Sequence, residues 1–411
     1  MAAEKNNKTL KSSIEREQKQ LAGSAEREKI KGSQNLNVPN LRFPEFSREW
    51  EKVSLSEIAT RVTRKNKNNE SRLPLTISAQ YGLVDQVTFF NKVVASSDMS
   101  NYYLLKRGEF AYNKSYSGDY PWGAIKRLDR YDQGALSSLY ICFAPTDIID
   151  SDFLVHYFES PKWHREVSNI AGEGARNHGL LNIAVPDFFN TQHCITTKKK
   201  EQRKIADFLN LINERIETQK KVIEKYESLI RGIYHSVFSK PSSILQLREV
   251  VSVVKGKQVN GEELLKEGEY YVMNGGTEPS GYLNEYNTPA NTISISEGGN
   301  SCGYVQYNIK PFWSGGHCYS LLQKDDGINY PYLYHFLKYM ERDIMALRIG
   351  SGLPNVQKKD LERFEIRVLP IEQQNRVAEI LEEVSAKCDL EKRILQRWQY
   401  QKSFLLSNLF I

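Results

Sequence analysis

The feature that most constrains this chain is an internal repeat. Residues 202–209 read Gln-Arg-Lys-Ile-Ala-Asp-Phe-Leu, and residues 374–381 read Gln-Asn-Arg-Val-Ala-Glu-Ile-Leu. A second repeated pattern, G-x-G-x-x-N, lies at 172–177 and 350–355. Solenoid repeats have periods of about 20–50 residues, whereas the first pair of copies stands 172 residues apart. The sequence therefore predicts two tandem modules, each a globular segment followed by a helix.

Each copy of the first repeated segment, at 202–209 and 374–381, begins a long charged segment in which apolar residues recur at alternating spacings of four and three. This spacing is the heptad pattern of a helix that packs against another helix. In the first copy the stripe consists of Ile205, Leu209, Ile212, Ile216, Ile223, Tyr226, Ile230, Ile233 and Val237. In the second copy it consists of Val377, Leu381, Val384, Cys388, Leu395, Trp398, Leu405 and Leu409.

Polar residues interrupt both stripes. Gln219 and Glu391 stand at equivalent positions, and Lys402 breaks the second stripe once more. We expect long helices at 200–240 and 372–411 that pair as an antiparallel coiled coil with pseudo-two-fold symmetry, about 48 Å long at 1.5 Å per residue. The second stripe should pair more loosely at Glu391 and Lys402, or admit a partner subunit there. The alternative is two unrelated amphipathic helices, each packed on its own domain.

The two globular segments, 40–199 and 241–371, follow a polar extension at 1–39. Both predict a mixed, strand-rich α/β (α+β) fold. Expected strands are 75–78, 108–113, 139–143, 270–273, 291–295 and 318–323; expected helices are 151–159, 161–169, 331–339 and 341–347. Sequence identity between the modules is confined to their C-terminal halves. This predicts one scaffold with two different binding surfaces.

Loops rich in Gly, Asn, Ser and aromatic residues are the candidate binding elements. Asn and Lys side chains can bond base edges or phosphates, and glycine permits close backbone approach. The other interpretation is that these loops are ordinary turns, with the first Gly and the Asn of G-x-G-x-x-N at positive φ. The candidate contact residues are Asn113, Lys114, Tyr116, Ser117, Tyr120, Trp122, Arg176, Asn177, Asn274, Thr277, Asn300, Asn355, Lys358 and Lys359.

Composition and missing motifs argue against catalysis and secretion. No apolar run reaches the roughly 18 residues of a membrane span, and the polar N-terminus lacks the apolar core of a signal peptide. Five scattered cysteines suggest free thiols in the cytoplasm and no zinc set. Phosphate-loop, methyltransferase and hydrolase motifs are absent. A net charge of +6 permits nucleic-acid binding without demanding it. We expect a binding protein with no catalytic residue, metal or cofactor of its own.

Three features together resemble the specificity subunits of Type I restriction–modification systems. They are the opening Asn40-Leu41-Arg42-Phe43-Pro44-Glu45-Phe46 with Trp50 and 55–58, the tandem plan, and the paired heptad helices. The resemblance covers roughly residues 40–411. It implies two target-recognition domains, each reading one half of a bipartite, asymmetric DNA site, with helices that set the spacer.

The resemblance also implies partners and cofactors. The helices would dock two methyltransferase subunits, and two restriction and motor subunits would join the assembly. S-adenosylmethionine, ATP and magnesium would belong to those partners. Two alternatives stay open: a two-headed carbohydrate- or peptide-binding scaffold on a coiled-coil stalk, and a stand-alone DNA-modifying enzyme.

Overall fold

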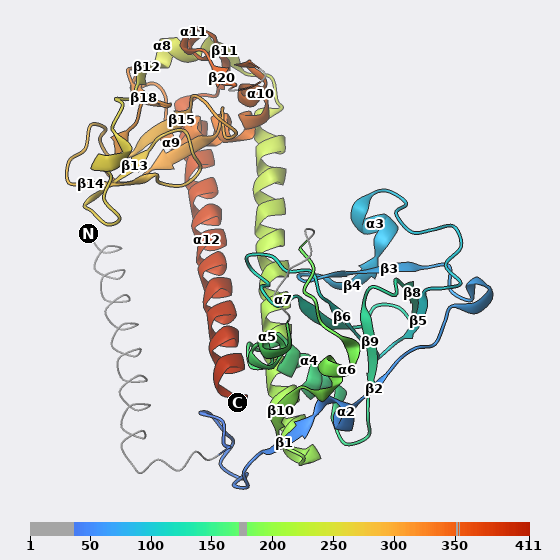
Figure 1. Ribbon diagram of the computed structural model, residues 1–411. Coiled ribbons are helices and arrows are strands. Elements are labelled where there is room, and N and C mark those ends of the chain that lie inside the picture. Colours follow the sequence, from blue (N-terminus) through green and yellow to red (C-terminus); the bar gives the residue numbers. More distant parts are fainter. Residues whose placement is uncertain (1–36, 172–178, 351, 353) are drawn as a thin grey trace. The chain divides into compact units, whose positions relative to one another are not determined.

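The computed structural model describes residues 37–171, 179–350, 352 and 354–411 (Figure 1). By contacts the chain divides into two compact units. Unit 1 comprises the described residues up to Glu214 together with Gln399–Ile411, and unit 2 comprises Arg215–Trp398. Each unit therefore contains part of both long helices, α7 (Lys199–Phe238) and α12 (Ile371–Asn408).

Unit 1 is built on two four-stranded sheets and one two-stranded sheet, with strand orders β2-β9-β6-β7, β4-β3-β8-β5 and β1-β10. Its strands are β1 (Glu51–Ser54), β2 (Ala59–Arg61), β3 (Pro74–Ser78), β4 (Gly82–Asp85), β5 (Tyr103–Lys106), β6 (Phe110–Asn113), β7 (Ala124–Arg127), β8 (Gln133–Leu136), β9 (Ile141–Pro145) and β10 (Gln192–Ile195). Its helices are α2 (Leu55–Ile58), η1 (Lys67–Asn69), α3 (Gln86–Phe90), α4 (Ser151–Glu159), α5 (His164–Ile170) and α6 (Val185–Asn190).

Unit 2 follows the same plan with one strand fewer in its second sheet. Its strand orders are β12-β18-β15-β16, β14-β13-β17, β11-β21 and β19-β20. Its strands are β11 (Ser243–Gln246), β12 (Val251–Lys255), β13 (Tyr270–Met273), β14 (Gly281–Leu283), β15 (Thr292–Ser296), β16 (Val305–Asn308), β17 (Trp313–Ser314), β18 (Cys318–Gln323), β19 (Arg348–Ile349), β20 (Asn355–Val356) and β21 (Glu365–Val368). Its helices are α8 (Leu247–Val250), η2 (Gly261–Glu263), α9 (Tyr330–Tyr339), α10 (Glu341–Ala346) and α11 (Lys358–Glu362).

The expected mixed α/β class is confirmed, and most of the expected elements are present with shifted ends. The strand expected at 108–113 begins at Phe110 because Gly108 has φ +85° and makes a turn. The strand expected at 291–295 begins at Thr292 because Asn291 has φ +55°. The helix expected at 161–169 begins only at His164.

The repeat extends further than the sequence comparison indicated, into the start of each module. Leu55-Ser56-Glu57-Ile58-Ala59 and Leu247-Arg248-Glu249-Val250-Val251 form the same strand–helix–strand corner. Both helices begin with a capping box, in which Glu57 or Glu249 bonds back to the backbone of Ser54 or Gln246. Divergence is therefore confined to the middle of each module.

Both long helices are present as expected. Neither contains proline, and α7 ends at Phe238, before Pro241. Every position of both predicted apolar stripes is buried or half-buried. This burial identifies the stripe as the packed face of each helix.

Within unit 2 the two helices run antiparallel, as expected. The C-terminal part of α7, with Ile230, Ile233 and Val237, shares a core with Val377 and Leu381 at the start of α12. Further back along α7, Gln219 Nε2 donates hydrogen bonds to the Glu391 backbone oxygen, at 3.2 Å, and to its carboxylate.

The residues expected to loosen the second stripe are paired. Glu391 meets Gln219, its own equivalent in the repeat. In unit 1, Lys402 Nζ lies 3.0 Å from Glu159 Oε2 on α4. The polar interruptions therefore pair with polar groups of the same unit.

Candidate nucleic-acid interface

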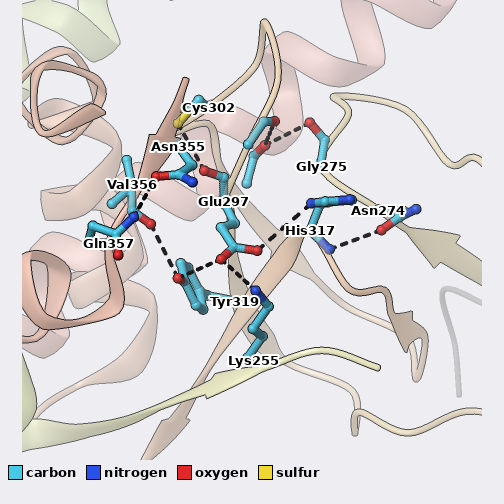
Figure 2. Close-up of polar contacts among 12 residues, drawn as sticks. Lys255, Asn274, Gly275, Glu297, Cys302, His317, Tyr319, Asn355, Val356 and Gln357 are labelled. Atoms are coloured by element: carbon cyan, nitrogen blue, oxygen red, sulfur yellow. Dashed lines mark hydrogen bonds and ion pairs between the residues drawn. The ribbon is translucent and has the colours of Figure 1, made fainter. Parts of the chain in front are cut away.

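Four segments of unit 2 meet around the loop that follows β15 (Figure 2). The Ser296 hydroxyl donates to the Gly275 carbonyl at 2.7 Å, which ties the loop after β13 to β15. The Glu297 N–H donates to the His317 carbonyl at 2.9 Å, and the Val356 N–H donates to the Glu297 carbonyl at 2.8 Å. Backbone hydrogen bonds thus fix this loop on both sides.

Glu297 is the centre of this cluster. Its side chain is buried, with the residue 8% exposed. Its Oε1 accepts from Lys255 Nζ at 2.7 Å and from the Tyr319 hydroxyl at 3.0 Å. Its Oε2 is buried without a hydrogen-bond partner among the described residues, and His317 Nδ1 lies 4.0 Å away (Figure 2).

The cluster combines buried anchors with exposed basic side chains. Lys255 and His317 have side chains 55% and 62% exposed, so both are accessible beside the buried carboxylate. The neighbouring Tyr319 hydroxyl is buried, and this burial, together with its hydrogen bond to Glu297, raises its pKa. Tyr319 therefore stays neutral and acts as a hydrogen-bond donor.

Close backbone approach holds the His317 loop in place. The His317 N–H donates to Asn274 Oδ1 at 3.1 Å. A Cβ at Gly315 would lie 2.6 Å from the same Asn274 oxygen, and one at Gly256 would lie 2.1 Å from the Gly315 carbonyl oxygen. Glycine is required at these positions because no other residue leaves room for the neighbouring chain.

Unit 1 places its candidate loop at the equivalent point, between β6 and β7. The Leu181 N–H donates to the Lys114 carbonyl at 3.0 Å, and the Tyr116 N–H donates to the Gly179 carbonyl at 3.0 Å. In unit 2 the matching bonds run from the Val356 N–H to the Glu297 carbonyl and from the Gly299 N–H to the Pro354 carbonyl, at 3.1 Å. Bridges between Ser115 and Leu180 and between Gly298 and Asn355 complete the match. Lys114 and Glu297 therefore occupy the same position of the fold.

Strand register supports this equivalence. Phe143 on β9 pairs with both Arg61 and Phe110, and Leu321 on β18 pairs with both Val253 and Ile293. Counting four residues along from Phe110 and from Ile293 gives Lys114 and Glu297. The two loops thus begin at the same position after corresponding strands.

Several predicted contact residues in unit 1 lie together on the loop after β6. Tyr116 and Tyr120 are exposed at 42% and 36%, and Ser117 lies with them in a turn in which the Ser117 and Tyr120 backbones bond each other. Trp122 is half-buried, and its carbonyl accepts from the Tyr112 hydroxyl at 2.7 Å. Asn113 Oδ1 accepts from the Ser115 N–H at 3.0 Å, so it shapes the loop. Arg176 and Asn177 lie outside the described residues.

The predicted residues of unit 2 divide into two groups. Asn274, Asn300 and Asn355 come from the segments that surround Glu297, and Thr277 is exposed on the loop after β13. Lys358 and Lys359 instead begin the short helix α11, where Lys358 Nζ lies 3.6 Å from Glu362. Whether any of these residues contacts a ligand stays a prediction.

The G-x-G-x-x-N pattern behaves only partly as the turn interpretation required. Gly350 has φ +101°, as expected for a turn glycine. Asn355 is not among the positive-φ residues and instead lies in strand β20, bridged to Gly298. The expectation for Asn355 is therefore wrong, because strand pairing decides its conformation. The first copy, at 172–177, lies outside the described residues.

Glu297, Lys255 and His317 were not among the contact residues predicted from the sequence. A signal existed for Glu297, since it directly follows a buried strand and stands at the head of a Gly-Gly-Asn loop. Lys255 and His317 reach the same place from distant segments, and only the sheet pairing brings them together.

Residues 240–397 match the family model for the Type I restriction modification DNA specificity domain. This segment of the chain is therefore similar to that specificity-domain family. The matched range contains the whole Glu297 cluster. The resemblance inferred from the sequence is confirmed.

Two curated relatives carry the same designation. A putative type I specificity subunit of Mycoplasma genitalium is 27% identical over 247 residues, which cover 56% of this chain and 64% of the relative. A putative type I specificity subunit of Mycoplasma pneumoniae is 35% identical over 137 residues, covering 33% of this chain and 36% of the relative. The chain thus spans less than two thirds of the length of each relative.

Solved structures support the specificity-subunit fold. The crystal structure of a Type I restriction–modification S subunit from M. genitalium matches with a TM-score of 0.64 at 21% identity, over 91% of this chain and 99% of that one. A structure described in terms of complex assembly and conformational transition of the type I restriction–modification system matches with a TM-score of 0.51 at 16% identity, over 87% of this chain and 96% of that one. Among the helices in the described part of the chain, none has the length and apolar character of a membrane span.

Proposed function

We propose that this chain is the DNA-recognition subunit of a Type I restriction–modification complex and has no catalytic activity of its own. Each unit reads one half of a bipartite, asymmetric site in double-stranded DNA. One observation carries the proposal: both units hold the same loop position by the same backbone bonds, yet fill it with opposite chemistry, Lys114 and Glu297. A shared backbone that carries different side chains is what we expect of two domains that recognise different half-sites.

The partners follow from this role. Two methyltransferase subunits bind the long helices, and two restriction and motor subunits join them in the cytoplasm. S-adenosylmethionine, ATP and magnesium act in those subunits. In this chain, the predicted bounds 40–199 and 241–371 serve as the recognition domains, with 1–39 as an extension. The predicted candidate residues supply the contacts.

Binding measurements on the complex with its methyltransferase subunits test DNA recognition. Because Lys and Arg neutralise phosphates, affinity for a specific duplex should fall steeply as salt rises. Methylome sequencing of a host with the complete system should yield one bipartite motif. Binding that ignores duplex DNA but responds to a carbohydrate or peptide would support the two-headed scaffold instead. Sustained DNA modification by the purified chain alone would overturn the non-catalytic assignment.

The helices carry a separate prediction, that they set the length of the spacer. One heptad inserted into both α7 and α12, at matching positions, adds about 10 Å of helix rise. The recognised spacer should then lengthen by about three base pairs, at 3.4 Å per base pair. Methylome sequencing measures the spacer directly. An unchanged spacer with active methylation would contradict this role for the helices.

A further inference from the structure

One position of the fold differs in charge between the two units while its backbone environment is the same. Lys114 and Glu297 each directly follow the inner strand of a four-stranded sheet, β6 or β15. Each offers its carbonyl to the N–H of a segment that returns from a distant part of the module, Leu181 or Val356. The backbone therefore aims both side chains from a fixed point, as a recognition contact requires.

The two side chains have complementary hydrogen-bonding chemistry. An ionised carboxylate only accepts hydrogen bonds, and an ammonium group only donates them. In the major groove, adenine and cytosine present exocyclic amines as donors, whereas guanine presents the acceptors O6 and N7. A glutamate therefore favours a base that presents an amine, and a lysine favours guanine, whose two acceptors can be bound together.

Glu297 retains one oxygen for such a contact. Oε1 already accepts from Lys255 and Tyr319. Oε2 is buried without a hydrogen-bond partner among the described groups. A buried acceptor that lacks its hydrogen bond costs about 1–3 kcal/mol. A donor from a ligand would remove that cost.

One exposed side chain lies beside Oε2. His317 is the neighbouring side chain, 4.0 Å away and 62% exposed (Figure 2). The proposed contact requires this exposed ring to move aside from Oε2. Lys255 is bonded to Oε1 and its side chain is 55% exposed, so it places a positive charge where a DNA phosphate could approach.

We propose that Glu297 and Lys114 are equivalent specificity-determining residues: Glu297 accepts a hydrogen bond from the exocyclic amine of an adenine or cytosine in one half-site, and Lys114 donates to a guanine in the other. This inference rests on the proposed function. It goes beyond that function by assigning a base chemistry to each unit.

The test uses the complex assembled with its methyltransferase subunits and duplexes that carry its methylated motif. Each base pair of both half-sites is replaced in turn, and affinities are measured for the wild type, Glu297→Gln and Lys114→Met. Glu297→Gln should reduce discrimination about 10-fold at one adenine- or cytosine-presenting position of a single half-site. Lys114→Met should do the same at one guanine of the other half-site.

Each variant contains its own folding control, because the half-site read by the other unit should be discriminated as in the wild type. Glu285→Gln, at an exposed glutamate of the same unit, should leave all positions unchanged. If Glu297→Gln does not assemble, Glu297→Asp keeps the charge but withdraws the oxygens, and should weaken the same position.

The outcomes separate the two proposals. A wild-type complex that binds every duplex equally would refute DNA recognition itself. A sequence-specific wild type whose variants keep full discrimination would overturn this inference alone. Loss spread evenly over all positions would also overturn it, since it would indicate a structural role.

Discussion

At the scale of single residues, Gln202 and Gln374 show the structural role of the repeated segments 202–209 and 374–381. Gln202 Oε1 accepts from the Asp150 N–H at 2.7 Å, and its Nε2 donates to the carbonyls of Ile148 and Thr196. Gln374 does the same with the Asn329 N–H and the carbonyls of Gly327 and Leu369. Asp150 and Asn329 are the N-caps of α4 and α9. Each glutamine thus joins the start of a long helix to the start of a short one.

Removal of one such glutamine should be costly. Gln374→Ala leaves three backbone groups without their partner, two of them in half-buried residues, so we expect it to lower the free energy of unfolding by about 2–3 kcal/mol. Gln373→Ala, one residue earlier and exposed, is the matched control and should change little. Urea denaturation of both variants measures the difference. Equal stabilities would refute the structural role of the repeat.

At the scale of elements, the part of the helix pair that lies in unit 2 contains one polar layer in an otherwise apolar stripe. Gln219 and Glu391 occupy equivalent positions of the repeat and bond each other. A polar residue in the interface of a coiled coil costs stability but specifies the register of the helices. In a shifted register the polar side chain would face apolar side chains and lose its hydrogen bond. We infer that this layer fixes the register of α7 and α12 in unit 2.

The register role predicts unequal effects of single and double substitutions. Gln219→Leu or Glu391→Leu alone leaves one polar side chain opposite leucine and should destabilise unit 2 by about 1–2 kcal/mol. The double variant restores an apolar layer and should recover that loss. Urea unfolding of all four proteins gives the coupling energy. Additive effects would show that the two side chains act independently.

At the scale of the whole molecule, buried histidines couple stability to pH. Burial lowers the pKa of His193 and of His335 to about 4. The same histidines in the unfolded chain take up protons below about pH 6.5. Unfolding therefore becomes more favourable as the pH falls from about 6.5 to 4, and the stability conferred by the neutral histidines is present above that window.

A single substitution should reduce this dependence. His335 bonds the Tyr234 hydroxyl through Nδ1 at 2.9 Å, and His335→Gln offers an amide that does not titrate. The slope of unfolding free energy between pH 6.5 and 4 should fall by up to about 1.4 kcal/mol per pH unit. Urea midpoints at four pH values give the slope. His235→Gln, at an exposed histidine, is the control.

The parts of the molecule that the sequence predicts best are those that depend on local pattern. Every residue of the two predicted heptad stripes is buried or half-buried, because helix periodicity can be read from consecutive residues. The two-residue strands β19 and β20 were not predicted, because they form by pairing with each other and not through a local sequence preference. Glu297 was missed for a related reason. Its role depends on Lys255, Tyr319 and His317, which only the sheet brings to it.

The composition of unit 1 has a consequence for how the protein is made. Phe410 packs against Trp50, Phe153 and Tyr157, so the core of the first unit includes an aromatic ring encoded after all of unit 2. A ribosome must therefore translate the whole second unit before the first can close its core. Unit 2 can complete its contacts earlier, since its residues are contiguous. During synthesis, the unit that begins first along the chain should thus be the last to complete its core.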